Sequence, residues 1–341
     1  MAKRIAMLGA GSWGTALAIV LAKSGHEVTL WARRPEAAEH MRRHRRNPTY
    51  LPRAQLPDEL SVTSVMEDAV TGCDMWVFAT PSHAIRDCAK NVRGHASDDL
   101  LCVSVAKGIE NNSLLTTTRV LHDVLDTVPM AHLGVLSGPS HAEEVAEEKP
   151  TTVVAAAYST DTVHEIQSTF ATSRLRVYMN HDVLGVEIAG SVKNVMAIGA
   201  GIGDGLGYGD NTKAAIVTRG LAEMKRLGLA MGAEGSTFSG LAGIGDLVVT
   251  CMSRHSRNRH VGELIGRGKR LEEVERDMSM VAEGVRTADS VHQLSVRYGI
   301  EMPITEAVYG ILFDGKQPQI AVDELMTRAP KREDWLPDVL T

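Results

Sequence analysis

The chain has 341 residues, 44% of them hydrophobic, and a formal net charge of −6 at pH 7. This length exceeds what one hydrophobic core usually supports, so two domains are expected. The mildly acidic charge gives no reason to expect a nucleic acid partner, and no uncharged apolar run is long enough to predict a membrane span.

The cysteines and histidines do not form a metal-binding pattern. The four cysteines show no C-x-x-C pair, so reduced thiols in a cytoplasm are the simplest interpretation. The 13 histidines are scattered without acidic co-ligands, and no metal site is predicted. The apolar N-terminal stretch contains three glycines and a tryptophan and runs into a strand pattern, which argues against a signal peptide.

Residues 5–33 predict a strand, a glycine turn, a helix and a second strand. In the G-x-G-x-x-G arrangement, Gly9 permits the tight turn, Gly11 lets the backbone approach a pyrophosphate, and Gly14 lets the helix pack closely on the strand. The helix that starts near Ser12 directs free N–H groups and its positive dipole end toward the phosphates. This pattern predicts dinucleotide binding.

The end of the second strand indicates which dinucleotide is bound. An NAD-binding fold usually places Asp or Glu there, but this chain has Ala32, Arg33 and Arg34. A guanidinium pairs well with a 2′-phosphate, so NADP(H) is predicted to be preferred, with NAD(H) possible. The alternative is two solvated arginines ahead of a helix that begins at Pro35.

Further apolar runs predict strands that alternate with helices. They are Asp74–Thr80, Leu100–Val105, His132–Leu136, Thr152–Ala157 and Leu175–Tyr178. The alternation predicts an α/β fold with a doubly wound parallel sheet, so residues 1–180 are interpreted as a dinucleotide-binding (Rossmann) domain. Ligands of such sheets bind beyond the carboxyl ends of the strands, where Thr80, Lys107 and Gly138 fall.

After residue 180 the apolar residues recur at helical spacing. The predicted helices are Val183–Ala200, Lys213–Met231, Val261–Gly266, Glu272–Met278, Thr287–Tyr298 and Ile304–Phe313. No convincing strand pattern follows residue 180. Residues 181–341 are therefore predicted to form an all-α domain that carries the substrate and catalytic groups.

One face of the first of these helices holds a single charged residue. Its members are Val186, Ala189, Gly190, Lys193, Met196, Ala197 and Ala200. Desolvation on a packed face lowers the pKa of a lysine, and a lysine with a lowered pKa can donate a proton near neutral pH. Lys193 is therefore a candidate proton donor. The alternative is a lysine whose stem is buried and whose ammonium reaches solvent at the helix edge.

Three other motifs place polar groups next to glycines or predicted element ends. Gly138-Pro139-Ser140-His141-Ala142 is a turn at a strand end. Asp246 lies in a glycine-rich loop, where it is either a partner for a lysine or a helix N-cap. Ser256-Arg257-Asn258-Arg259 groups donors suited to a phosphate monoester, and the alternative is a solvated loop.

Together these strings resemble the bacterial NAD(P)-dependent glycerol-3-phosphate dehydrogenases, from about residue 5 to about residue 310. The motifs that carry the resemblance are residues 9–14, 106–108, 138–142, 192–195, 205–213, 241–246 and 256–259. The resemblance implies reversible NAD(P)H-dependent reduction of dihydroxyacetone phosphate to sn-glycerol 3-phosphate for phospholipid synthesis. It also implies a homodimer.

The resemblance also implies residue roles. Lys193 would be the catalytic proton donor and acceptor. The substrate set would be Lys107, Gly138, Ser140, Lys193, Asp246, Ser256, Arg257 and Asn258. The cofactor set would be Gly9, Gly11, Ser12, Trp13, Gly14, Arg33, Arg34, Tyr50, Lys107, Ala142, Arg257, Val281 and Glu283.

The chain departs from the family pattern at two places: His141 stands where Phe is common, and Ser191 where Ala or Thr is common. Two alternative functions stay open at this point. One is a related β-hydroxyacid dehydrogenase of the 6-phosphogluconate or hydroxyisobutyrate type. The other is a non-catalytic NADP(H)-sensing protein.

Overall fold

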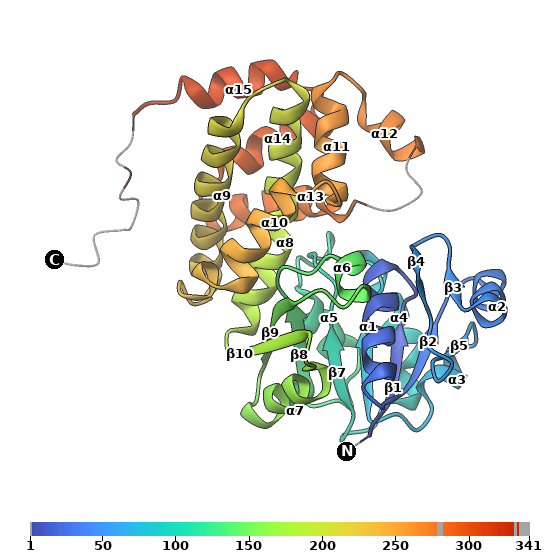
Figure 1. Cartoon of the computed structure of the whole chain (residues 1–341). Helices are drawn as coiled ribbons and strands as arrows, with labels where there is room; N and C mark the ends of the chain where they lie inside the picture. Colours follow the sequence, from blue (N-terminus) through green and yellow to red (C-terminus); the bar gives the residue numbers. More distant parts are fainter. Residues whose placement is uncertain (1, 278–281, 331–332, 334–341) are drawn as a thin grey trace.

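The structure, a computed structural model, describes residues 2–277, 282–330 and 333. A sheet with helices on both faces is followed by a region in which the described residues form only helices and loops (Figure 1). The strands are β1 Arg4–Leu8, β2 Glu27–Trp31, β3 Arg46–Asn47, β4 Leu51–Gln55, β5 Ser61–Thr63, β6 Met75–Phe78, β7 Leu101–Ser104, β8 Leu133–Ser137, β9 Thr151–Ala157 and β10 Leu175–Asn180. The helices of the first part are α1 Ser12–Lys23, α2 Pro35–His44, α3 Met66–Val70, α4 Ile85–Val92, α5 Thr117–Val124, α6 Ala142–Ala146 and α7 Thr160–Phe170.

The helices of the second part begin three residues after the last strand. They are α8 Val183–Gly205, α9 Asp210–Met231, α10 Asp246–Met252, α11 Arg257–Gly266, α12 Leu271–Asp277, α13 Glu283–Tyr298, α14 Pro303–Phe313 and α15 Pro318–Met326. All six predicted helices are present, most of them a few residues longer than predicted. Met278, the last residue of one predicted helix, lies outside the described residues.

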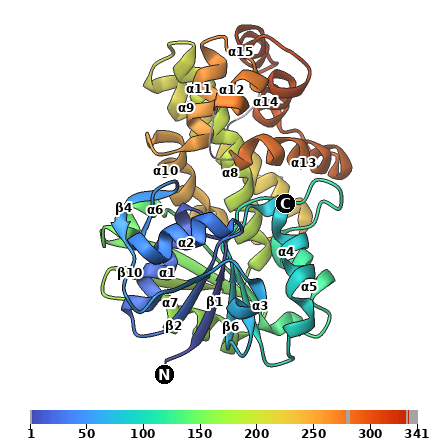
Figure 2. The ribbon, with the colours of Figure 1, turned by 90° about the vertical axis from the view of Figure 1, so that its right-hand side faces the viewer.

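The main sheet has the order β10-β9-β8-β7-β6-β1-β2-β5. Its central strands β6 and β7 are buried throughout, because α1 and α7 cover one face and α3, α4 and α5 cover the other (Figure 2). Continuous apolar strands are what a sheet buried on both faces requires. The predicted α/β Rossmann fold followed by a helical region is therefore confirmed.

The sheet departs from the predicted parallel arrangement at one edge. Strand β9 pairs antiparallel with β8, and β10 then runs parallel to β9. A parallel connection needs a crossover to the opposite end of the sheet. After β8 the chain instead forms the five-residue helix α6 at the carboxyl end of the sheet, so the next strand runs back from there.

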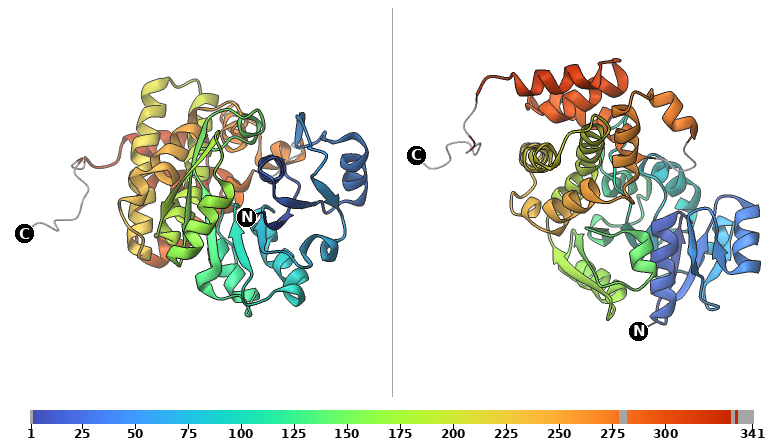
Figure 3. Two further views of the ribbon diagram at one scale, coloured as in Figure 1. Left: turned by 60° about the horizontal axis from the view of Figure 1, so that its bottom comes forward. Right: turned by 45° about the horizontal axis from the view of Figure 1, so that its top comes forward.

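Helix α8 is the centre of the second part, and α9, α11 and α14 surround it (Figure 3). Glycines let α11 approach it closely: a Cβ on Gly201 would lie 1.9 Å from the carbonyl oxygen of Arg259, and one on Gly262 would lie 2.0 Å from that of Ile198. This contact fixes the first half of α11 beside the C-terminal part of α8.

The core is continuous between the two parts. Val135 and Val154 of the sheet belong to the same apolar cluster as Val192 and Val195 of α8. The division at residues 180 and 181 stays a prediction. Within the described residues, α8 is the one helix long and apolar enough to cross a membrane, but 94% of that stretch is buried inside the protein, as in the core helix of a globular fold.

Candidate active site

Two lysines from different parts of the chain share one carboxylate. Lys193 lies in the middle of α8, Lys107 follows β7, and Asp246 is the first residue of α10. The Lys193 ammonium donates to Oδ1 of Asp246, and the Lys107 ammonium donates to Oδ2 at 2.7 Å. Lys107 also donates to the carbonyl oxygen of Gly138 at 3.0 Å. Four predicted site residues are thus brought together by direct hydrogen bonds.

Burial controls the charges in this cluster. Lys193 is 5% exposed and Asp246 is 1% exposed. Burial lowers the pKa of Lys193 to about 7; the nearby Asp246 carboxylate opposes this shift, and the Lys107 ammonium adds to it. Burial alone would raise the pKa of Asp246, but the two ammonium groups outweigh burial and lower that pKa. Lys193 therefore does not reach solvent at the helix edge.

Asp246 is not a helix N-cap. Gly245 holds the capping position of α10, and Asp246 follows it in the first turn with its carboxylate directed to the lysines. The wide turn η5 (Leu241–Gly245) leads into this helix. The glycine-rich sequence supplies that turn, since a Cβ on Gly243 would lie 2.0 Å from the carbonyl oxygen of Phe238.

Lys193 has a further partner that was not predicted from the sequence. The ammonium also donates to Oγ1 of Thr250 at 2.8 Å, and this hydroxyl donates to the backbone oxygen of Asp246. Thr250 lies four residues after Asp246, so the two residues share one face of α10. That spacing was the available signal. A Cβ on Gly190 would lie 2.9 Å from Oγ of Ser137, so this glycine allows the end of β8 to pack closely against α8.

The turn after β8 forms another wall of the site. Gly138 has a φ of +118°, which favours glycine, and the Ser140 hydroxyl donates to its carbonyl oxygen at 2.9 Å. Ala142 is buried as the first residue of α6. His141 is the N-cap residue of this helix, and its side chain makes no capping hydrogen bond.

The segment Ser256–Asn258 is the start of α11 and not a solvated loop. The Ser256 hydroxyl accepts from the Arg259 backbone as the N-cap, and Asn258 is buried, where its side-chain oxygen accepts from the Gly284 backbone. Arg257 is exposed. Burial raises the pKa of Glu283, and the positive charges of Arg257 and Lys107 oppose this shift. The Glu283 carboxylate accepts from the backbone N–H of Ser82 at 2.8 Å, which joins the helical part to the sheet.

The glycine turn after β1 fits the phosphates of a dinucleotide. A Cβ on Gly14 would lie 2.0 Å from the Gly9 carbonyl oxygen, so close packing requires glycine there. A Cβ on Gly11 would meet no atom within 4 Å, so this side of the turn is open. The first turn of α1 has no acidic residue and no capping side chain, and the buried Nε1 of Trp13 has no protein partner. These free donors suit an anionic ligand.

The β3–β4 hairpin folds over this turn. The Ser12 hydroxyl donates to the backbone oxygen of Tyr50 at 2.7 Å. The side-chain amide of Asn47 donates to the backbone oxygen of Ala10 and to the Thr15 hydroxyl, both at 2.9 Å. Asn47 was not predicted as a site residue, because its partners lie more than 30 residues away.

The remaining cofactor candidates lie at the rim or outside the described residues. Arg33 and Arg34 follow β2 and are exposed, and Arg34 precedes the helix that Pro35 begins. Burial lowers the pKa of His83, and the charges of Arg286 and Arg33 act in the same direction. Val281 lies outside the described residues. No group of three potential metal ligands occurs among the residues described.

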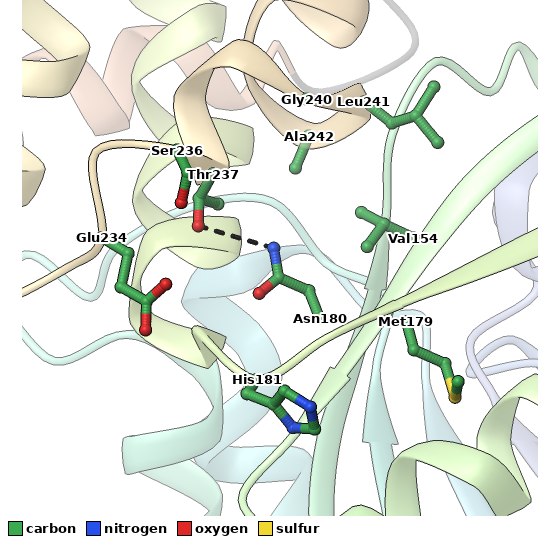
Figure 4. A pocket seen from close by; sticks show the side chains of 10 residues that line it. All are labelled: Val154, Met179, Asn180, His181, Glu234, Ser236, Thr237, Gly240, Leu241 and Ala242. Atoms are coloured by element: carbon green, nitrogen blue, oxygen red, sulfur yellow. Dashed lines mark hydrogen bonds between the residues drawn. The ribbon is translucent and has the colours of Figure 1, made fainter.

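A cavity of about 340 Å³ lies beside the segment that leads to Asp246 (Figure 4). Asn180 and His181 at the end of β10 line one side, and Thr237 and Leu241 line the other. None of the predicted site residues lines this cavity. The cavity shares no lining residue with the lysine–aspartate cluster, and we assign it no role.

Comparison with known proteins identifies the family of this chain. The family models for the N-terminus and C-terminus of NAD-dependent glycerol-3-phosphate dehydrogenase match residues 4–163 and 182–323. A glycerol-3-phosphate dehydrogenase [NAD(P)+] from Salinibacter ruber is 58% identical over 98% of both chains. One from Chlorobium limicola is 54% identical, covering 96% of this chain and 99% of the relative. The crystal structure of glycerol-3-phosphate dehydrogenase from Coxiella burnetii superposes with a TM-score of 0.92 at 38% identity, over 96% of this chain and 99% of the other.

Proposed function

This chain belongs to the NAD-dependent glycerol-3-phosphate dehydrogenase family, and we propose that it reversibly reduces dihydroxyacetone phosphate to sn-glycerol 3-phosphate with Lys193 as proton donor and acceptor. Family membership makes it an NAD(P)-dependent oxidoreductase. The observation that carries the proton-transfer role is the buried ammonium of Lys193 held against Asp246.

The chemistry divides between the cofactor and the protein. A bound nicotinamide supplies the hydride that goes to C2 of the ketone. Lys193 donates a hydrogen bond to the ketone oxygen and then the proton that the alkoxide requires. Lys107 adds a second positive charge beside the developing oxyanion. Asp246 orients both ammonium groups, and the Thr250 hydroxyl fixes the direction of the Lys193 side chain.

The phosphate of the substrate is assigned to the start of α11. Ser256, Arg257 and Asn258 lie in its first turn, where helix N–H groups and the dipole favour an anion. Arg257 adds a guanidinium that can pair with phosphate oxygens. Gly138 and Ser140 form the facing wall of the substrate site.

The finer properties are proposed on the sequence pattern and the resemblance. Arg33 and Arg34 support a preference for NADP(H), with NAD(H) also accepted. We further propose a homodimer, a role in supplying phospholipid synthesis, and a cytoplasmic location. The free thiols of all four cysteines are compatible with a reducing compartment.

A direct assay tests the reaction. The protein is mixed with NADPH and dihydroxyacetone phosphate, and loss of absorbance at the reduced nicotinamide band is followed. Turnover that requires the phosphate group, and is absent with unphosphorylated dihydroxyacetone, supports the proposal. Turnover with 6-phosphogluconate or hydroxyisobutyrate and NADP+ in its place would support the related dehydrogenases. Binding of NADPH with no turnover of any of these substrates would indicate a sensor.

A further inference from the structure

Two histidines from different parts of the chain meet beside the substrate site. The rings of His141 and His255 have centroids 5.6 Å apart and are tilted by 55°. His141 follows Ser140 in the turn after β8, and His255 immediately precedes the Ser256 cap of α11. The pair therefore joins the two segments to which the substrate is assigned.

The buried ring nitrogen of His141 is available to a ligand. Its Nε2 atom is buried and has no hydrogen-bond partner among the described residues. Burial lowers the pKa of this imidazole, and the charges of Lys193 and His255 act in the same direction. A buried nitrogen without a partner is costly unless a ligand or water binds to it.

We propose that His141 and His255 are a further part of the substrate site, as an imidazole pair that takes up one shared proton when the substrate phosphate binds and donates to that phosphate. The inference rests on the proposed function, because it needs a phosphorylated substrate at the start of α11. The proton comes from solvent and returns to it when the ligand leaves. Two adjacent imidazolium ions would repel one another, so the pair holds one proton rather than two.

Several charged groups surround the pair and influence its protonation. Those that act on His141 are Glu143 and Glu144 of its own helix and Lys193 of α8. Glu147, the C-cap of α6, forms an ion pair with Lys149 and also interacts with the charges of Arg53 of β4 and of His255. The carboxylates favour an imidazolium and Lys193 opposes it. A bound phosphate would bring at most two negative charges, which would favour protonation of the imidazole pair.

An aromatic ring without a nitrogen could pack at position 141 but could not carry a proton. His141→Phe is therefore a variant expected to fold, and His141→Asn is a polar second variant. His255 is exposed, so His255→Asn should leave the fold intact.

Proton uptake on binding tests the proposal. Dihydroxyacetone phosphate is titrated calorimetrically into the NADP+ complex, which holds no hydride to transfer, at pH 7.5 in two buffers of different ionisation enthalpy. The wild type should take up more protons than His141→Phe or His255→Asn, by on the order of a few tenths of a proton. The double variant should show no smaller proton uptake than either single variant, because the two imidazoles share one proton. His164→Asn, an exposed histidine on α7, is the matched control and should not change the count.

Affinity gives a second readout. At pH 6.5, His141→Phe and His141→Asn should bind dihydroxyacetone phosphate about three- to tenfold more weakly than the wild type, and the difference should vanish by pH 8.5. A proton count and an affinity equal to the wild type in both His141 variants would overturn the proposal. Turnover of dihydroxyacetone phosphate by the wild type, followed in parallel, shows whether the proposed function itself stands. Failure of the imidazole pair is thereby distinguished from failure of the reaction.

Discussion

Lys193 and Asp246 lie 53 positions apart in the chain, yet the ammonium of one donates directly to the carboxylate of the other. Both side chains are almost completely buried. Removing one partner of such a pair leaves a buried charge without compensation. Burial lowers the pKa of Lys193 on its otherwise apolar helix face, while Asp246 opposes that shift and compensates the buried charge. This arrangement suits proton transfer to a ketone.

The first prediction concerns pH. Because Lys193 must be protonated to donate, kcat/KM for the reduction of dihydroxyacetone phosphate should fall as pH rises through about 7, the pKa that burial gives this lysine. Oxidation of glycerol 3-phosphate needs the neutral amine, so its kcat/KM should rise through the same pH. Initial rates in both directions at saturating cofactor check this. Parallel profiles in the two directions would contradict it.

The second prediction concerns Asp246. Asp246→Asn removes the carboxylate that raises the pKa of Lys193 against the effect of burial. The pH at which reduction fails should therefore move downward, and turnover at pH 7.5 should fall. Thr250→Val is the matched comparison, since it removes one hydrogen-bond acceptor but no charge, and should shift the profile less. An unshifted profile in an Asp246→Asn protein of normal thermal stability would remove Asp246 from the proton-transfer scheme.

The third prediction concerns the substrate phosphate. Arg257→Ala should raise KM for dihydroxyacetone phosphate about tenfold or more, with a smaller effect on kcat, because a charge-assisted contact of about 1.5–3 kcal/mol is lost. Arg254→Ala, an exposed arginine three residues earlier, is the control. Equal KM values for the two variants would place the phosphate elsewhere.

The fourth prediction concerns the cofactor. If Arg33 and Arg34 hold a 2′-phosphate, the double alanine variant should raise KM for NADPH by about 10- to 100-fold and change KM for NADH little. Arg42→Ala, in the last turn of α2, serves as the control. An equal increase in KM for NADPH and NADH would show that the arginines do not bind the 2′-phosphate.

Local patterns predicted much of the fold and several residues of the candidate site. The glycine turn and Lys193 were visible because each depends on neighbours within a few residues or on one helix face. Strand β9 was predicted, but its antiparallel direction was not, because strand direction depends on where the preceding connection ends, which apolar patterning does not encode. The same limit explains Asn47, whose contacts join segments far apart in the chain.

Contacts between residues far apart in the chain also could not be predicted from the sequence. Asp246 and Ser256 were recognised as candidates, but the sequence left open whether they were partners, caps or loop residues. The structure distinguishes them: Ser256 caps α11, whereas Asp246 leaves the capping position to Gly245 and binds two lysines. The meeting of His141 and His255 could not be predicted, because it depends on how the helical part sits against the sheet.

Turnover by Lys193 variants tests the central claim most directly. Lys193→Met, which fills the space without a charge, and Lys193→Ala are each measured with NADPH affinity determined by fluorescence titration. We predict unchanged NADPH affinity and a fall in kcat for dihydroxyacetone phosphate of about 10²–10³. Near-normal kcat in either variant, with NADPH still bound, would contradict the assignment of Lys193 as the proton donor.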